Sequence, residues 1–467
     1  MKNTRRTFEN PCLTQVRITS KRLPVRLCMM ALVLLALSAF AFTPAAHAAP
    51  ARPLVPNIAP LAEPDFVGGY SWTDQGSKNV VYVDTNLHVE RMWVVSGGIW
   101  QRIDLTATYG FPSAAASAHP VTGFTIKASL KHVQEILYVD GNNHIEAITI
   151  ALSGKVTVAD LTKASTDPHK PVGSAAALAG YSWSDGTSYA QYVLFVDNQS
   201  PSHVEELYRS YIAGVDSFWH YLDLTQASGA TAPGQMPAGQ TITGYSWHDG
   251  STPTQHVFYI TSGGDIGEFF LDLAQSSQWQ YKGLRTFVKS APAPWSSTLS
   301  AYVYADTREE INYVSQNSAS LNHVIEIYGQ TAANNWHMLD LTNAAGGVPA
   351  VPPSGQFNIA AYQWSYLVGL TLHRYRQVVY QTTANNIEEL YVAGAGTTWQ
   401  AASLTGITGA PLAVNPGKHS IAGYTWYDSN LAETLKQVVY ITQAGHIEEL
   451  YVLPLGHWQA ADLSART

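Results

Sequence analysis

Short runs of apolar residues, separated by turn residues, recur along most of the chain. The clearest run is His446-Ile447-Glu448-Glu449-Leu450-Tyr451, in which Ile447, Glu449 and Tyr451 share one face of an extended strand. The β-branched and aromatic run Val438-Val439-Tyr440-Ile441 precedes it, and such composition favours a strand over a helix. No stretch beyond the first fifty residues has a convincing helical period, so the pattern predicts an all-β protein.

The same series of strands returns seven times, at intervals of roughly 55 to 64 residues. Each copy opens with a strand like Gly423-Tyr424-Thr425-Trp426, continues with two more strands, and ends with a strand that begins at a tryptophan and runs to Asp-Leu-Thr or a near variant. The copies start near Gly69, Gly123, Gly180, Gly244, Ala301, Ala361 and Gly423. Four short strands per copy predict a seven-bladed β-propeller of four-stranded antiparallel blades over residues 68–467. A β-solenoid is the main alternative, although its rungs are usually shorter.

The first 48 residues are predicted to be a signal peptide. A basic stretch ending in Lys21, Arg22 and Arg26 runs into an apolar block over 27–42, and Ala46-His47-Ala48 follows as a cleavage site. Residues 49–67 are then a linker, and the body of the protein is expected to be secreted or extracytoplasmic. An uncleaved membrane anchor is the alternative, but no membrane insertion is expected once the signal is removed.

Composition narrows the class of ligand. Both cysteines, Cys12 and Cys28, lie in the predicted signal, so the mature chain forms no disulfide. Outside that signal the chain holds 19 basic and 33 acidic residues, which makes nucleic acid an unsuitable partner. Charged residues make up 13% of the chain and aromatic residues 11%, a balance that suits neutral polar ligands such as sugars.

The third strand, the turn before it and the tryptophan after it resemble the repeat of the fungal fucose-specific lectins and their bacterial relatives. In the last copy the matching residues are Val439-Tyr440, Gly445, Ile447, Glu449 and Gly456-His457-Trp458. The resemblance implies a β-propeller that binds sugars between neighbouring blades. An Arg and a Glu would hydrogen-bond the hydroxyl groups, and aromatic rings would stack on the apolar face of the sugar.

The resemblance also implies which residues bind the sugar. The glutamate falls on Glu206, Glu268, Glu326, Glu389 and Glu449 in the last five copies, whereas Arg91 and Ala147 stand there in the first two. The stacking tryptophan falls on Trp219, Trp279, Trp336, Trp399 and Trp458 in the same five copies and on Trp100 in the first, whereas Val156 replaces it in the second. Four or five sugar sites are therefore expected.

Two departures from that family narrow the prediction. Its arginine column holds only apolar residues here: Val80, Ile136, Val193, Val257, Ile311, Val378 and Val438. A neighbouring polar column with Asn79, His256, Gln377 and Gln437 is not expected to substitute, because adjacent strand positions point to opposite faces. The family also usually has six blades. We therefore expect a lectin-like propeller of unknown sugar specificity.

Structural explanations of the repeated residues stay open. The tryptophans could be core packing, and the glutamates could form hydrogen bonds to a neighbouring blade. A histidine column, with His88, His144, His203, His323 and His446, exchanges with Asp265 and Asn386, which favours turn capping over metal binding. No metal or cofactor is predicted.

The leading hypothesis is a secreted, non-catalytic propeller with several weak sugar sites between its blades, whose partners are glycans or glycoconjugates. No motif of a known catalytic centre is present, and acidic residues that recur from blade to blade do not suit a single catalytic pair. The alternatives are a protein-interaction or surface-structural propeller and, more remotely, a polysaccharide hydrolase or lyase. The sequence does not predict the oligomeric state.

Overall fold

The computed structural model describes residues 66–116, 120–128, 131–165, 173–184, 188–197, 202–212, 215–229, 242–249, 252–272, 278–290, 292–293, 297–315, 322–329, 335–347, 351, 358–414, 420–452 and 456–466. All of them belong to one compact unit of the chain. The predicted signal peptide and residues 49–65 of the predicted linker lie outside the described residues, so both stay predictions.

The described strands form seven antiparallel sheets, one for each sequence repeat. Blade one holds β1 (Val67–Trp72), β2 (Ser77–Val83), β3 (Val89–Val95) and β4 (Gln101–Asp104). Blade two holds β5 (Val121–Ala128), β6 (Lys131–Val139), β7 (Ile145–Ala151) and β8 (Val156–Asp160). Blade three holds β9 (Gly173–Ser184), β10 (Tyr189–Asp197), β11 (Val204–Ile212) and β13 (His220–Asp223), and the short β12 (Val215–Asp216) also pairs with β11.

Blade four holds β14 (Ile242–Asp249), β15 (Thr252–Ile260), β16 (Ile266–Asp272) and β17 (Gln280–Gly283). Blade five holds β18 (Leu299–Tyr304), β19 (Arg308–Ser315), β20 (His323–Gly329) and β21 (His337–Asp340). Blade six holds β22 (Ile359–Val368), β23 (Thr371–Gln381), β24 (Ile387–Ala393) and β25 (Gln400–Ser403). Blade seven holds β26 (Ile421–Asp428), β27 (Glu433–Ile441), β28 (Ile447–Val452) and β29 (Trp458–Asp462).

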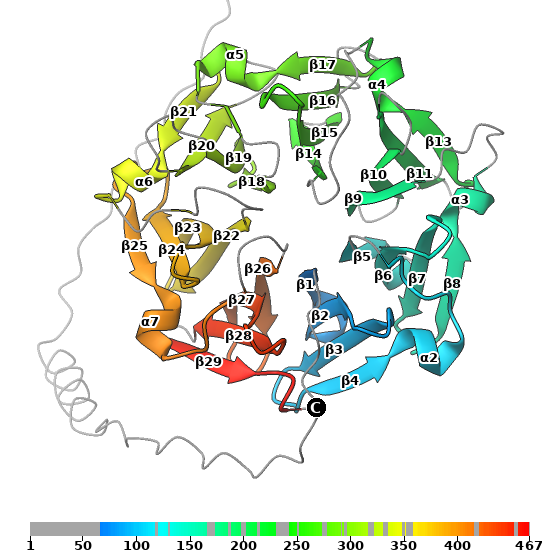
Figure 1. The fold of residues 1–467 in the computed structure, drawn as a ribbon, viewed down its shortest axis with the longest axis horizontal. Coiled ribbons are helices and arrows are strands. Elements are labelled where there is room, and N and C mark those ends of the chain that lie inside the picture. Colours follow the sequence, from blue (N-terminus) through cyan, green and yellow to red (C-terminus); the bar gives the residue numbers. More distant parts are fainter. Residues whose placement is uncertain are drawn as a thin grey trace, which may run out of the picture. The chain divides into compact units, whose positions relative to one another are not determined.

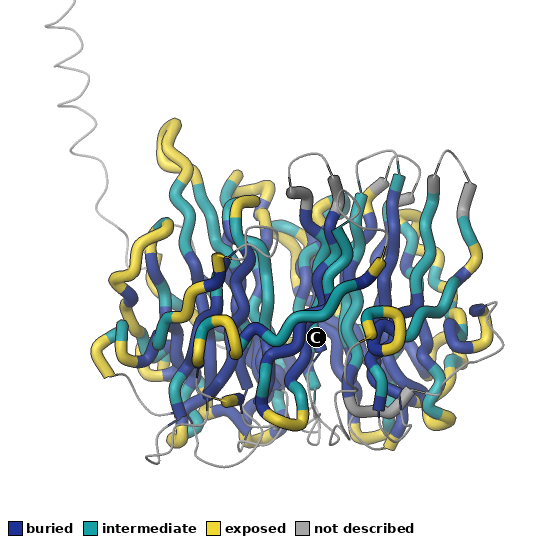
Figure 2. Tube along the Cα trace, turned by 90° about the horizontal axis from the view of Figure 1, so that it is seen from above, coloured by how far each residue is buried: buried dark blue, intermediate teal, exposed yellow. Residues whose placement is uncertain are grey.

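The seven sheets stand around a common centre, with the first strand of each blade innermost and the fourth outermost (Figure 1). The all-β, seven-bladed propeller predicted from the repeats is therefore confirmed. Exposed residues gather at the ends of the strands (Figure 2). None of the helices in the described part of the chain is long and apolar enough to cross a membrane.

The second strand of each blade is buried on both faces because the blade packs between two neighbours. In β10 all nine residues are buried, and Val80 and Val81 of β2 have no exposed surface. This explains why the second strands are almost continuously apolar, a pattern typical of strands covered on both sides.

The innermost strands approach closely because glycine receives an aromatic ring from the preceding blade. A Cβ atom at Gly123 would lie 2.1 Å from the Tyr70 ring, and one at Gly69 would lie 2.4 Å from the Tyr424 ring. The second contact joins blade seven to blade one, so the ring closes through the same packing that joins its other blades.

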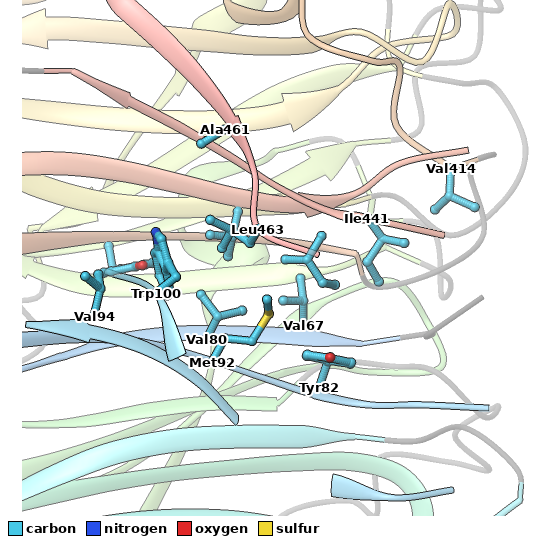
Figure 3. Close-up of a cluster of buried hydrophobic side chains, with 13 residues drawn as sticks. Val67, Val80, Tyr82, Met92, Val94, Trp100, Val414, Ile441, Ala461 and Leu463 are labelled. Atoms are coloured by element: carbon cyan, nitrogen blue, oxygen red, sulfur yellow. The ribbon is translucent and has the colours of Figure 1, made fainter. Parts of the chain in front are cut away.

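A cluster of buried apolar side chains also joins blades one and seven, farther from the centre of the propeller (Figure 3). Val80, Met92 and Trp100 of blade one pack in one cluster with Ile441 and Leu463 of blade seven. No strand is exchanged between these two blades in the described part of the chain, so closure depends on side-chain packing, as predicted.

Short helices of four or five residues follow the fourth strand in blades one to six, which sequence analysis did not predict. They are α2 (Leu105–Tyr109), α3 (Leu161–Ala164), α4 (Leu224–Ala227), α5 (Leu284–Val288), α6 (Leu341–Ala344) and α7 (Leu404–Thr408). Such helices are too short to leave a helical period in the sequence. Four of them, α2, α3, α4 and α6, begin at an Asp-Leu-Thr motif whose aspartate caps the helix, as Asp340 does for the Asn343 amide in α6. Gly283 and Ser403 precede α5 and α7 and give no side-chain cap.

Candidate functional site

The predicted glutamates all point into interfaces between neighbouring blades. In the last blade, Glu449 of β28 lies opposite Val439 of β27, and Tyr451 lies opposite Gln437. These four residues face blade one, whereas Lys436 and Val438 face blade six. Alternation along a strand thus gives each blade one polar column toward each neighbour.

None of the five glutamates is open to solvent. The exposed fraction is 2% for Glu206, 1% for Glu389 and Glu449, and 0% for Glu268 and Glu326. A buried carboxylate is unfavourable unless a partner stabilises it. The residues that contact each glutamate therefore determine the charge of the interface and the groups that it can bind.

In three interfaces a cation from the following blade contacts the glutamate. The Lys436 Nζ atom lies 2.8 and 3.0 Å from the two carboxylate oxygens of Glu389, and the Lys78 Nζ atom lies 2.6 Å from Glu449 Oε1. The Arg376 guanidinium donates to both oxygens of Glu326, at 3.0 and 2.8 Å. Burial raises the pKa of Glu389, and Lys436 opposes this shift.

Sequence analysis missed this cation column. Lys78, Arg376 and Lys436 each stand two residues before the apolar residue that occupies the arginine column of the fucose-specific lectins. The signal was a basic residue just before the apolar part of the second strand, because such a residue needs an acidic partner when buried. The partner could not be identified from one repeat alone, since it lies in the neighbouring blade.

The polar column beside the apolar one contributes glutamines that contact these lysines; the expectation that it does not replace the arginine in sugar binding stays a prediction. Lys436 Nζ donates to Gln377 Oε1 at 3.1 Å, and Lys78 Nζ donates to Gln437 Oε1 at 3.3 Å. The glutamine lies on the same face as the glutamate of its own blade. It completes the binding of the cation but carries no charge itself.

Four of the five predicted stacking tryptophans are buried, and two of them lie beside an arginine. The exposed fraction is 8% for Trp219, Trp279 and Trp336 and 3% for Trp399. Arg376 lies 5.0 Å from the Trp399 ring centre, and Arg209 lies 4.8 Å from that of Trp219, both within cation–π distance. These rings therefore stabilise the blade interfaces from within.

Trp458 differs from the other predicted tryptophans because it is half-buried and lines a cavity. The cavity has a volume of about 370 Å³ and lies between blades six and seven. Its walls include Trp364, Tyr366, Tyr375, Tyr391, His457 and Trp458, and its polar groups include Gln377, Glu389 and Lys436. Lys436 Nζ lies 4.5 Å from the Trp458 ring centre. Aromatic walls around a few fixed polar groups are typical of small-molecule sites.

The interfaces of the first three blades are built differently. Arg91, which takes the place of the glutamate in blade one, donates to Asn79 Oδ1 at 3.0 and 2.8 Å. In the second blade, where Ala147 takes that place, Glu135 accepts from Gln191 Nε2 at 3.2 Å and Arg209 lies 3.6 Å away. The first two copies therefore lack the predicted arrangement, as their sequences indicate.

His256 occupies the interface of blades four and five. Its Nδ1 atom lies 2.9 Å from Glu268 Oε1 and 3.0 Å from Glu309 Oε2, and Tyr245 donates to Glu309 at 2.9 Å. The three carboxylate and imidazole groups lie close enough to hold a metal ion. Burial lowers the pKa of His256, but the two carboxylates raise it more, to about 10. The protonated imidazole forms an internal ion pair with both carboxylates at neutral pH.

The histidine column has a structural role, but the role is not turn capping. His88, His203, His323 and His446 each place Nδ1 at 2.6 to 2.8 Å from the aspartate that ends the fourth strand of the same blade. In the first blade the turn itself is capped by Asp84, whose Oδ1 accepts from the backbone amide of His88 at 2.8 Å.

Comparison with solved structures identifies similar folds. The lectin BP39L from Burkholderia pseudomallei has a TM-score of 0.60 at 15% identity, covering 85% of this chain and 98% of that chain. A variant of AofleA from Arthrobotrys oligospora has a TM-score of 0.48 at 13% identity, covering 75% and 88%. A fucose-specific lectin from Aleuria aurantia has a TM-score of 0.46 at 14% identity, covering 86% and 96%.

No protein-family model and no curated protein matches the chain. The likeness to the Burkholderia lectin is a likeness of fold alone at this level of identity. The predicted resemblance to the fucose-specific propeller lectins is thus confirmed in architecture, and this chain has a lectin-like β-propeller fold.

Proposed function

We propose that this protein is a non-catalytic, carbohydrate-binding propeller that acts outside the cytoplasm. The observation that carries the proposal is the cavity between blades six and seven, where Trp458, Trp364 and Tyr391 surround the Lys436–Glu389 pair. Ring faces suit the C–H surface of a sugar, and a fixed ion pair offers both a donor and an acceptor to its hydroxyl groups.

The size of the cavity supports a small ligand. Its volume of about 370 Å³ is near the lower end of the range of roughly 300–1,000 Å³ for small-molecule sites. Because Lys436 and Glu389 already neutralise each other, a neutral sugar would need no further charge compensation. The predicted sites at Glu206, Glu268, Glu326 and Glu449 stay predictions.

A glycan array of the purified protein, followed by calorimetry with the sugars that bind, tests this function. Trp458→Ala should weaken binding at least tenfold, because it removes the one predicted tryptophan that lines the cavity. Phe218→Ala is the matched control, since Phe218 is an aromatic residue, 76% exposed, just before β13 on blade three. Equal binding by the two variants, or a folded protein that binds no glycan, would contradict the proposal.

A protein-interaction function is the second candidate, and the hairpin of β22 and β23 favours it. The tip exposes Leu367, Val368, Leu370 and Leu372, with Leu370 fully exposed. Exposed apolar groups of this kind often mark contacts with other proteins. A folded protein that binds no sugar would favour this second function.

A further inference from the structure

In two interfaces between blades, a lysine ammonium group lies between a glutamate and several aromatic rings. Lys436 extends from β27 into the interface of blades six and seven, where its ammonium contacts Glu389 and lies 5.2 Å from the Trp364 ring centre and 5.6 Å from that of Tyr391. Trp458 completes this ring of aromatic groups at 4.5 Å. One carboxylate and three aromatic rings thus hold one primary ammonium group.

The interface of blades seven and one repeats this arrangement. The Lys78 ammonium contacts Glu449 and lies 5.1 Å from the Trp100 ring centre, 5.2 Å from that of Trp426 and 5.4 Å from that of Tyr451. Two independent copies therefore select the same group, by charge and by cation–π attraction.

The interface of blades three and four keeps the acidic and aromatic residues, but its described residues place no lysine beside them. Glu206 stands in the place of Glu389, whereas Gln255 of β15 stands in the place of Lys436. The Gln255 side chain donates to the Tyr192 hydroxyl at 2.9 Å. The three aromatic positions are filled by Trp183, Tyr208 and Trp279, which belong to one apolar cluster.

No cation pairs with Glu206 in the part of these two blades that the structure describes. Glu206 is 2% exposed, and its Oε2 atom has no hydrogen-bond partner among the described residues. The titratable groups that face it are the hydroxyls of Tyr181, Tyr192 and Tyr208, none of which supplies a positive charge. Burial raises the pKa of Glu206 to about 8. An ammonium group placed beside it would restore the ion pair that the other two interfaces contain.

We infer that the interface of blades three and four binds the protonated primary amine of an amino sugar, at the place that a lysine ammonium occupies in the equivalent interfaces. The amine would contact Glu206 and lie among Trp183, Tyr208 and Trp279. The half-buried side chains of Trp183 and Tyr208 give the approach from solvent. The sugar part of this inference rests on the proposed function, whereas the ammonium part rests on the two lysine-filled interfaces.

Calorimetry with glucosamine at pH 7 tests the inference, with N-acetylglucosamine as the neutral analogue. We expect saturable binding of glucosamine to one site and binding at least tenfold weaker for the acetylated sugar. Binding should also release a proton, because the ammonium shifts Glu206 from its protonated to its ionised form. The measured enthalpy should therefore depend on the ionisation enthalpy of the buffer.

Two variants locate the site. Gln255→Lys should place an internal ammonium beside Glu206, as Lys436 does beside Glu389, and should abolish glucosamine binding in a folded protein. Glu206→Gln should abolish both the binding and the proton release. Undiminished binding by Gln255→Lys, or equal affinity for glucosamine and its acetylated analogue, would overturn the inference.

The outcome can be separated from that of the proposed function. Trp458→Ala changes only the cavity between blades six and seven, so glucosamine binding between blades three and four should survive it. A protein that binds neutral sugars through Trp458 but shows no glucosamine binding would refute this inference and leave the proposed function intact.

Discussion

Lys78 and Glu449 lie 371 residues apart in the chain, yet the lysine Nζ atom lies 2.6 Å from the glutamate Oε1 atom where the last blade meets the first. The side chains are 8% and 1% exposed, so the pair is shielded from water. Together with the contact of Gly69 and Tyr424, it makes the closing interface equivalent to that of blades six and seven. The propeller therefore closes with a repeated interface and needs no exchanged strand.

Removal of the lysine from this pair should destabilise the fold. Lys78→Met leaves Glu449 buried without a cation, which typically reduces the free energy of unfolding by about 3–5 kcal/mol. The double variant Lys78→Met/Glu449→Met should recover most of this loss, because it removes the buried charge as well. Urea denaturation monitored by tryptophan fluorescence measures both. Equal stability of the single and double variants would show that the charge is compensated elsewhere.

The carboxyl group of Glu206 should make stability depend on pH. Burial raises its pKa from 4.5 to about 8, so its contribution is fully present below pH 4.5 and is lost as the pH rises through 8. Glu206→Gln should therefore nearly match the wild type near pH 5 and exceed it at pH 9, by on the order of 5 kcal/mol. Thermal unfolding of both proteins across this range measures the difference, and parallel curves would contradict it.

A methyl group at Gly123 should strain the innermost packing of blade two. Its Cβ would lie 2.1 Å from the Tyr70 ring, so either the ring or the strand must move. Overpacking of this kind costs about 1–3 kcal/mol. Gly141→Ala in the same blade is the matched control, because a Cβ there meets nothing within 4 Å. A Gly123→Ala variant as stable as this control would show that the Tyr70 ring relocates freely.

Blade four lacks the histidine–aspartate pair found in other blades, and two substitutions can introduce it. Asp265 stands in the histidine column and Gly283 in the aspartate column, and Asp265 Oδ1 accepts from the backbone amide of Arg285 at 2.9 Å. A Cβ at Gly283 would lie 2.6 Å from Asp265 Oδ2. Gly283→Asp alone should therefore lower the melting temperature. Asp265→His/Gly283→Asp should restore it by recreating the pair of His323 and Asp340; no recovery would contradict the equivalence of the blades.

The strand pattern was predictable because its signals are local. Alternation such as Ile447, Glu449 and Tyr451 reflects the two faces of one strand, and the recurrence of Gly423-Tyr424-Thr425-Trp426 reflects one unit of packing used seven times. The short helices were missed because four or five residues show no helical period. The Asp-Leu-Thr motif at which most of these helices begin was recognised in the sequence, but its role as a helix cap was not.

The candidate site was only partly predictable. The sequence placed Glu389 and Trp458 in matching columns, and both line the cavity between blades six and seven. It did not reveal that Lys436 would face Glu389, nor that Trp399 would lie buried beneath Arg376.

The sequence by itself determined the number of blades, the order of their strands and the face that each side chain takes. The tertiary structure decided which charges meet, because the partner of each glutamate comes from the next blade and not from its own repeat. It also decided which tryptophan stays accessible. The burial of a side chain depends on how two neighbouring sheets pack against each other. The spacing of residues within one repeat does not determine how close those two sheets lie.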